Sequence, residues 1–136
     1  MHEATRYLRD RDGVGTAIRA LVRTELEAAW TANARVLLIG HSLGSVIAYD
    51  TLWDLSHEAP PSRGRVDLFV TMGSPLATHF IRRRLRGCGE TGKARYPANI
   101  RRWVNLTAKG DTTALTPRLA PEFREMVALG DRKSVV

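Results

Sequence analysis

The chain has 136 residues, a formal net charge of +7, 43% hydrophobic residues and one cysteine. This composition is typical of one soluble globular domain and excludes a collagen-like or disordered chain. The longest fully apolar runs, such as residues 36–39, are far shorter than the roughly 18 residues of a membrane-spanning helix, so we expect no integral membrane segment. The first residues carry no apolar stretch typical of a secretory signal, and we therefore expect a cytoplasmic location.

The positive charge comes mostly from arginine, since only Lys93, Lys109 and Lys133 are lysines. A nucleic-acid interface would combine such charge with aromatic residues or a reading motif on one face. The densest cluster, residues 82–86, has neither, so we interpret it as a solvated helix face and expect no nucleic-acid partner. Attraction to phosphate or to anionic lipid stays open. Cys88 stands alone, which predicts neither an internal disulfide nor a zinc site.

The predicted elements alternate between helices and strands. Residues 14–30 carry apolar residues three and four positions apart, which predicts an amphipathic helix. Residues 35–40 form a continuous apolar run closed by a glycine, as is typical of a strand covered on both faces in a parallel sheet. A second helical pattern begins at Leu43 and ends before Pro60.

The second half of the chain repeats this alternation. It predicts, in order, a buried strand over 65–72, a short arginine-rich helix over 79–86, a glycine-rich loop to residue 97, a third strand over 100–107 and a short helix over 121–129. Such an order is typical of an α/β domain with a parallel sheet. Three strands make a thin sheet, so we expect residues 1–130 to be part of a larger α/β core.

The expected core consists of apolar residues on the strands and on the second predicted helix: Val36, Leu38, Ile39, Val46, Ile47, Phe69, Val70 and Val104. Residues 131–136 are expected to form a disordered or non-native tail, because their codons can be written as a common sequencing adapter. Such a tail is not expected to be part of the fold.

The nucleophile elbow motif G-x-S-x-G is matched by Gly40-His41-Ser42-Leu43-Gly44, between the first strand and its helix. A sharp turn there strains the serine backbone and lifts the hydroxyl above the carboxyl edge of the sheet. We expect glycine at 40 and 44 because side chains there would collide with neighbours. The motif predicts Ser42 as a nucleophile and the N–H of Leu43 as a donor to an oxyanion. The alternative is a turn in which Ser42 only caps the helix.

A serine nucleophile needs a histidine base that is oriented by a carboxylate, and the chain order in this arrangement is serine, acid, histidine. Asp111 follows the third predicted strand and is the expected acid; the alternative is an aspartate that opens a turn. No histidine follows Asp111 in the sequence. Among the earlier ones, His79 is the one placed to approach Ser42, whereas we expect His41 to be a packed neighbour and His57 a cation at a helix end.

Residues 36–50 strongly resemble the elbow region of α/β-hydrolase lipases and esterases, particularly bacterial ones. Residues 71–76 look like the segment that closes the next strand in those proteins. The strand over 103–105 and the Asp111 that follows it are similar to their strand and acid loop, which supports Asp111 as the triad acid. The resemblance extends over residues 14–111, and the elbow is its most specific part.

The resemblance implies that this chain holds the fifth to seventh strands of an α/β-hydrolase sheet and is an internal piece of a longer hydrolase. Ser74 lies in the strand-closing segment and is expected near a substrate pocket. The family's last strand and catalytic histidine, and the loop that gives the second oxyanion donor, have no counterpart here.

The activity that the resemblance implies is cleavage of a carboxylic ester, from a small molecule or a lipid, through an acyl-enzyme and without a metal or cofactor. Because the histidine is missing, we expect the chain alone to be close to inactive. Two alternatives stay open. One is a non-catalytic relative that serves as a binding or scaffold module, and the other is acyl transfer to an acceptor other than water.

Overall fold

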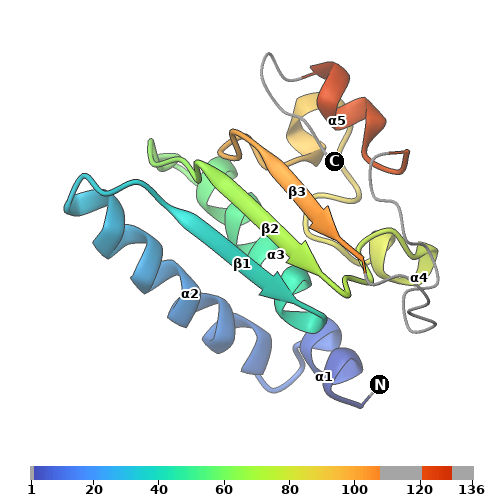
Figure 1. Cartoon of the computed structure of the whole chain (residues 1–136). Helices are drawn as coiled ribbons and strands as arrows, with labels where there is room; N and C mark the ends of the chain where they lie inside the picture. Colours follow the sequence, from blue (N-terminus) through green and yellow to red (C-terminus); the bar gives the residue numbers. More distant parts are fainter. Residues whose placement is uncertain (1, 108–120, 130–136) are drawn as a thin grey trace.

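The computed structural model describes residues 2–107 and 121–129, and a parallel sheet forms its centre (Figure 1). The strands β1 (Leu37–His41), β2 (Leu68–Met72) and β3 (Trp103–Leu106) lie in the order β1-β2-β3. Both strand pairs are parallel. The expected α/β fold with a parallel sheet is therefore confirmed.

The described helices are α1 (His2–Arg9), α2 (Val14–Thr31), α3 (Leu43–His57), α4 (His79–Arg82) and α5 (Arg124–Leu129), with a 3₁₀ turn η1 (Gly92–Arg95). The apolar periodicity predicts α2, α3 and α5, but not α1 or η1. The helix expected over 79–86 ends at Arg82. Beyond it, the N–H of Arg84 bonds the carbonyl of Ile81, three residues back, so the chain continues as turns.

The helix α3 is the centre of the packing, because it lies against the sheet on one side and against α2 on another. Its residues Val46, Tyr49 and Leu52 are completely or almost completely buried. Burial on several sides explains why α3 is apolar around most of its circumference rather than along one stripe.

The connections between strands place their helices on one face of the sheet. Right-handed crossovers that step in the same direction across a parallel sheet put their helices on the same side. Both crossovers here, from β1 to β2 and from β2 to β3, step in the same direction. No helix of the described residues therefore covers the opposite face, which we call the open face (Figure 1).

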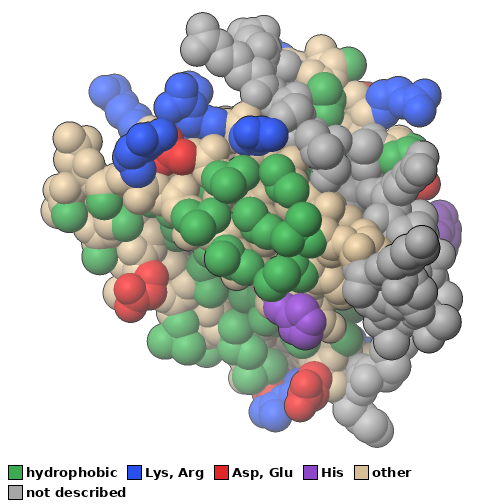
Figure 2. Space-filling view, viewed as in Figure 1, with side chains coloured by type: hydrophobic (Ala, Val, Ile, Leu, Met, Phe, Trp, Pro, Cys, Tyr) green, Lys and Arg blue, Asp and Glu red, His purple; other side chains and the backbone are tan. Residues whose placement is uncertain are grey.

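The open face is almost entirely apolar, and a contiguous hydrophobic surface covers the sheet in the space-filling view (Figure 2). Alternation along the paired strands assigns to it Leu37, Ile39, His41, Leu68, Val70, Met72, Val104 and Leu106. Leu37, Ile39 and Leu106 are 59%, 54% and 51% exposed. An apolar patch of this kind is uncommon on a protein surface.

This open face corrects two expectations. Ile39, expected in the core, is exposed, and β1 is not covered on both faces by the described residues. The predicted core residues Val36, Val46 and Phe69 are buried, whereas Leu38 and Ile47 are half-buried against the core. Val70 and Val104 are half-buried on the open face. The tail expected over 131–136 lies outside the described residues.

The covered face of the sheet is filled by aromatic rings. Phe69 and Trp103 pack with ring centroids 5.2 Å apart, and Phe123, which precedes α5, lies 4.9 Å from Trp103. The indole N–H of Trp103 donates to the Thr71 hydroxyl at 2.9 Å, so its polar atom is satisfied inside the core. This cluster connects α5 to the sheet beneath α3.

Candidate active site

Ser42 occupies the turn between β1 and α3 in a backbone conformation that few side chains adopt. Its φ is 52° and its ψ is −124°, outside the helical and extended regions. Such strain costs on the order of 1–3 kcal/mol and persists only where neighbouring groups hold it. Here the Ser42 N–H donates to the carbonyl of Met72 at 2.9 Å, which ties the turn to the end of β2. The strained turn expected at Ser42 is present.

The Ser42 side chain is exposed and does not cap the helix. Ser42 holds the N-cap position of α3, yet its hydroxyl makes no capping hydrogen bond. The same hydroxyl bonds to no other side chain in the described part of the chain. The alternative in which Ser42 serves only as a helix cap therefore finds no support in this geometry.

Leu43 brings a backbone donor to the same turn. As the first residue of α3, it has an N–H group without a carbonyl acceptor inside the helix. The dipole of the 15-residue helix adds partial positive charge at this end. The N-terminus of α3 can therefore stabilise negative charge that develops beside the Ser42 hydroxyl.

The two glycines of the elbow, Gly40 and Gly44, differ in how much space a side chain would find there. A Cβ built on Gly40 would lie 2.6 Å from Cα of Ser45 and 2.9 Å from its nitrogen, so a side chain at position 40 collides with backbone, as expected. A Cβ on Gly44 meets nothing within 4 Å among the described residues. The collision expected at Gly44 is not found among residues 2–107 and 121–129.

A serine network, formed by Ser42, Ser45 and Ser74, lies under the elbow. The Ser45 N–H and hydroxyl both donate to the Ser42 carbonyl, at 3.0 Å and 2.6 Å. The Ser45 and Ser74 hydroxyl oxygens are 2.7 Å apart. Ser74, which was expected near a substrate pocket, is only 6% exposed and is used within this network. Ser45 was not predicted as part of the site, and its signal in the sequence is a polar residue among the apolar ones in the first turn of α3.

His41 ends β1 directly before Ser42, and its side chain is exposed. It pairs with Met72 in the register and so lies on the open face. A Cβ built on Gly73 would be 3.6 Å from its Nε2, which places the ring beside that glycine. His41 makes no hydrogen bond to the Ser42 hydroxyl.

The other two described histidine side chains do not complete a triad either. His57 ends α3, where its Nε2 lies 2.6 Å from the carbonyl oxygen of Tyr96, and His79 is exposed at the start of α4. Neither bonds to Ser42 in residues 2–107 and 121–129. The expected acid, Asp111, lies outside the described residues. The described part of the chain thus joins a strained serine and a backbone donor without a base.

A buried carboxylate, Asp50, lies on α3 away from the elbow and was not predicted. It is 2% exposed, and burial raises its pKa to about 6. Its carboxylate accepts hydrogen bonds from the Tyr7 hydroxyl at 2.7 Å and from the backbone N–H of Arg86 at 2.9 Å, which act against that rise. Asp50 therefore connects α1 and the loop after α4 to the central helix.

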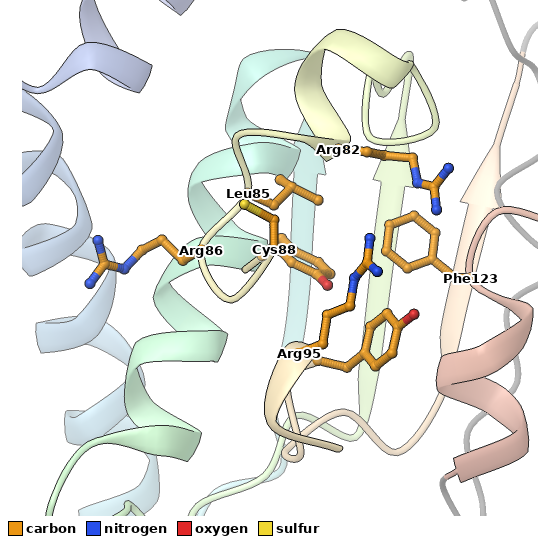
Figure 3. A pocket seen from close by; sticks show the side chains of 8 residues that line it. Arg82, Leu85, Arg86, Cys88, Arg95 and Phe123 are labelled. Carbon is orange, nitrogen blue, oxygen red and sulfur yellow. The ribbon is translucent and has the colours of Figure 1, made fainter. Parts of the chain in front are cut away.

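A cavity between α3, α4 with the loop after it, η1 and Phe123 brings the guanidinium groups of Arg82 and Arg95 into one space (Figure 3). It has room for about one water molecule. Arg82 is paired with Glu122 at 2.5 Å, so part of its charge is already neutralised. The size of this cavity excludes it as an ester-binding pocket.

The arginine side chains of residues 82–86 form more contacts within the protein than expected for a solvated helix face. Besides the Arg82 pair, Arg86 forms an ion pair with Asp54, and the guanidinium of Arg84 lies 3.8 Å from the ring centroid of Phe80. Ile81 and Leu85, on the opposite side, are buried in the core. They are therefore the packed face of this segment.

No protein-family model matches the chain, and no curated protein or solved structure matches it. Within residues 2–107 and 121–129, none of the helices has the length and apolar character needed to cross a membrane. The same residues contain no group of three or more His, Cys, Asp or Glu side chains that could hold a metal ion. The geometry at Ser42 is the observation from which a function is inferred.

Proposed function

We propose that Ser42 is the nucleophile of a serine hydrolase that cleaves carboxylic esters. One observation carries this proposal: a non-glycine residue with φ 52° and ψ −124° presents an exposed hydroxyl at a strand-to-helix turn and does not use it as a cap. Strained residues of this kind cluster at functional sites, because a purely structural turn would place glycine there.

In the proposed reaction the Ser42 oxygen attacks the acyl carbon while its proton passes to a base. The N–H of Leu43 donates to the oxyanion of the tetrahedral intermediate. The intermediate collapses to an acyl-serine, and the alcohol leaves with the proton from the base. Water then attacks the acyl-serine and releases the carboxylic acid and free Ser42. Asp111 is proposed to orient the protonated base.

The test measures acylation of Ser42 itself, because the described residues bring no base to it. The full chain is treated with p-nitrophenyl acetate in the presence of lutidine, a base too hindered to attack the ester. Peptide mass spectrometry then follows the acyl group on each serine. In the folded chain we expect Ser42 to be acylated faster than the half-buried Ser62. This difference in rate should disappear after unfolding in urea. Equal acylation of Ser42 and Ser62 would overturn the proposal, and Ser42→Ala controls the assignment.

A binding or scaffold role is the second proposal, and it is favoured by the lack of any hydrogen bond between Ser42 and a histidine in the described residues. It predicts that Ser42 reacts no faster than Ser62 under every condition above. Acyl transfer uses the same residues as hydrolysis, so analysis of the products with an added alcohol separates the two.

A further inference from the structure

The serine network has a defined direction. Ser45 has one hydroxyl proton, and it is donated to the Ser42 carbonyl, which can only accept. In the contact between Ser45 and Ser74 the donor must therefore be Ser74. The Ser74 oxygen in turn accepts the backbone N–H of Leu76 at 3.2 Å. Every hydrogen bond in this series is donated toward the Ser42 carbonyl. In such an arrangement each hydrogen bond strengthens the next.

The Ser42 carbonyl, which accepts the last of these hydrogen bonds, belongs to the same planar peptide unit as the N–H of Leu43. In a trans peptide the C=O and N–H of one unit point in opposite directions. Two donors from Ser45 hold the C=O, so they also fix the direction in which the Leu43 N–H points. The other side of Ser42 is held by its own N–H on the Met72 carbonyl. Both peptide planes that flank the strained serine are therefore anchored.

We propose that Ser45 and Ser74 are positioning residues that aim the Leu43 N–H at the oxyanion. This inference rests on the proposed function of Ser42. Both hydroxyls are buried, with residue exposures of 0% and 6%, so neither touches a substrate. They act on the reaction through the orientation of one peptide unit.

The test compares a pair of esters that differ in one atom. p-Nitrophenyl acetate develops negative charge on oxygen, whereas its thiono analogue develops it on sulfur, a weak hydrogen-bond acceptor. Ser45→Ala is expected to slow acylation of Ser42 by the oxygen ester roughly 10-fold, a part of the 10²–10³ that a lost oxyanion donor costs. Acylation by the thiono ester should change little. Ser74→Ala should have the same selectivity with a smaller effect, because Ser45 still reaches the carbonyl.

Ser56→Ala is the matched control. Ser56 also lies on α3, and its hydroxyl likewise donates to a carbonyl, that of Leu52, and accepts an N–H, that of Ala98. It is expected to leave both rates unchanged. Thermal unfolding checks that each variant is folded. If Ser45→Ala does not fold, Ser74→Ala takes its place in the test.

The outcomes separate the two proposals. If Ser42 of the unmodified chain is not selectively acylated, the proposed function fails and the positioning role fails with it. If Ser42 is acylated, but the Ser45→Ala and Ser74→Ala variants lose the oxygen and thiono reactions equally or lose neither, only the positioning role is overturned.

Discussion

Gly40 and Ser45 approach each other so closely that a Cβ on Gly40 would lie 2.6 Å from the Cα of Ser45. Real Cβ atoms do not come this close to backbone, and neither residue can move away freely, since Gly40 pairs with Thr71 in the sheet and Ser45 is fully buried. The close approach lets α3 begin directly over the end of β1.

Gly40→Ala is therefore expected to destabilise the protein by at least about 2 kcal/mol, because strand and helix must separate. Gly44→Ala is the matched control. Its Cβ meets nothing within 4 Å in the part of the chain that the structure describes, and alanine is favoured over glycine in a helix by up to about 1 kcal/mol. Urea unfolding of the two variants measures the difference. Equal destabilisation would contradict the geometry described for the elbow.

Ser42→Gly is expected to raise the free energy of unfolding relative to Ser42→Ala. Glycine tolerates φ 52° and ψ −124°, so it releases strain of order 1–3 kcal/mol, whereas alanine retains the strain. The greater flexibility of glycine in the unfolded chain offsets roughly 0.5–1 kcal/mol of this gain. Chemical denaturation gives both values. Equal stability of the two variants would show that the backbone at this position is relaxed.

Asp50 predicts a pH dependence of stability. Burial raises its pKa from 3.8 to about 6, so between these values the folded protein binds a proton that the unfolded chain releases. The contribution of Asp50 to stability is complete below about pH 4 and falls by roughly 3 kcal/mol as pH rises through 6. Asp50→Asn should remove this slope from unfolding curves measured between pH 4 and 7.

Asp67→Asn is the control for that slope, because the pKa of Asp67 is lowered, chiefly by the hydrogen bond from the Val36 backbone N–H. A group with a lowered pKa contributes stability that is lost as pH falls. The Asp67→Asn variant should keep the slope of the free energy of unfolding between pH 4 and 7. It should change that free energy only at more acidic pH. If Asp50→Asn leaves the slope intact, the carboxylate is not buried as described.

Two neighbouring residues of β1 should respond oppositely to the same substitution. Ile39→Lys places a charge on the open face, where Ile39 is 54% exposed, and should reduce binding of a hydrophobic dye and aggregation with little loss of stability. Leu38→Lys places the charge against the core and should cost at least about 1 kcal/mol. Dye fluorescence and thermal unfolding distinguish them. The reverse order would mean that the faces of the sheet are assigned wrongly.

Features encoded by neighbouring residues were predictable from the sequence, and features created by packing were not. The periodicity before residue 33 and the apolar run after it predicted α2 and β1 because each pattern is local. The helix α1 was missed, since it depends on a distant contact, the hydrogen bond from Tyr7 to Asp50. Ile39 was misplaced because an apolar run does not reveal that all described crossovers lie on one side.

The same distinction holds for the site. The elbow is five consecutive residues, so its motif was visible, and so was the need for glycine at position 40. Ser45 and Ser74 are separated by 29 positions, and only the pairing of β1 with β2 brings them together. Sequence spacing alone does not show such a contact.

From outside α3, Ser42 is held directly by the Met72 carbonyl and indirectly, through Ser45, by the Ser74 hydroxyl, and both groups come from one short stretch at the end of β2. Loop exchange, insertion or chemical modification at residues 72–74 would thus change the backbone orientation at Ser42 without a substitution at Ser42 itself. If the proposed function holds, a change of ester preference would begin at that neighbouring loop rather than at the motif.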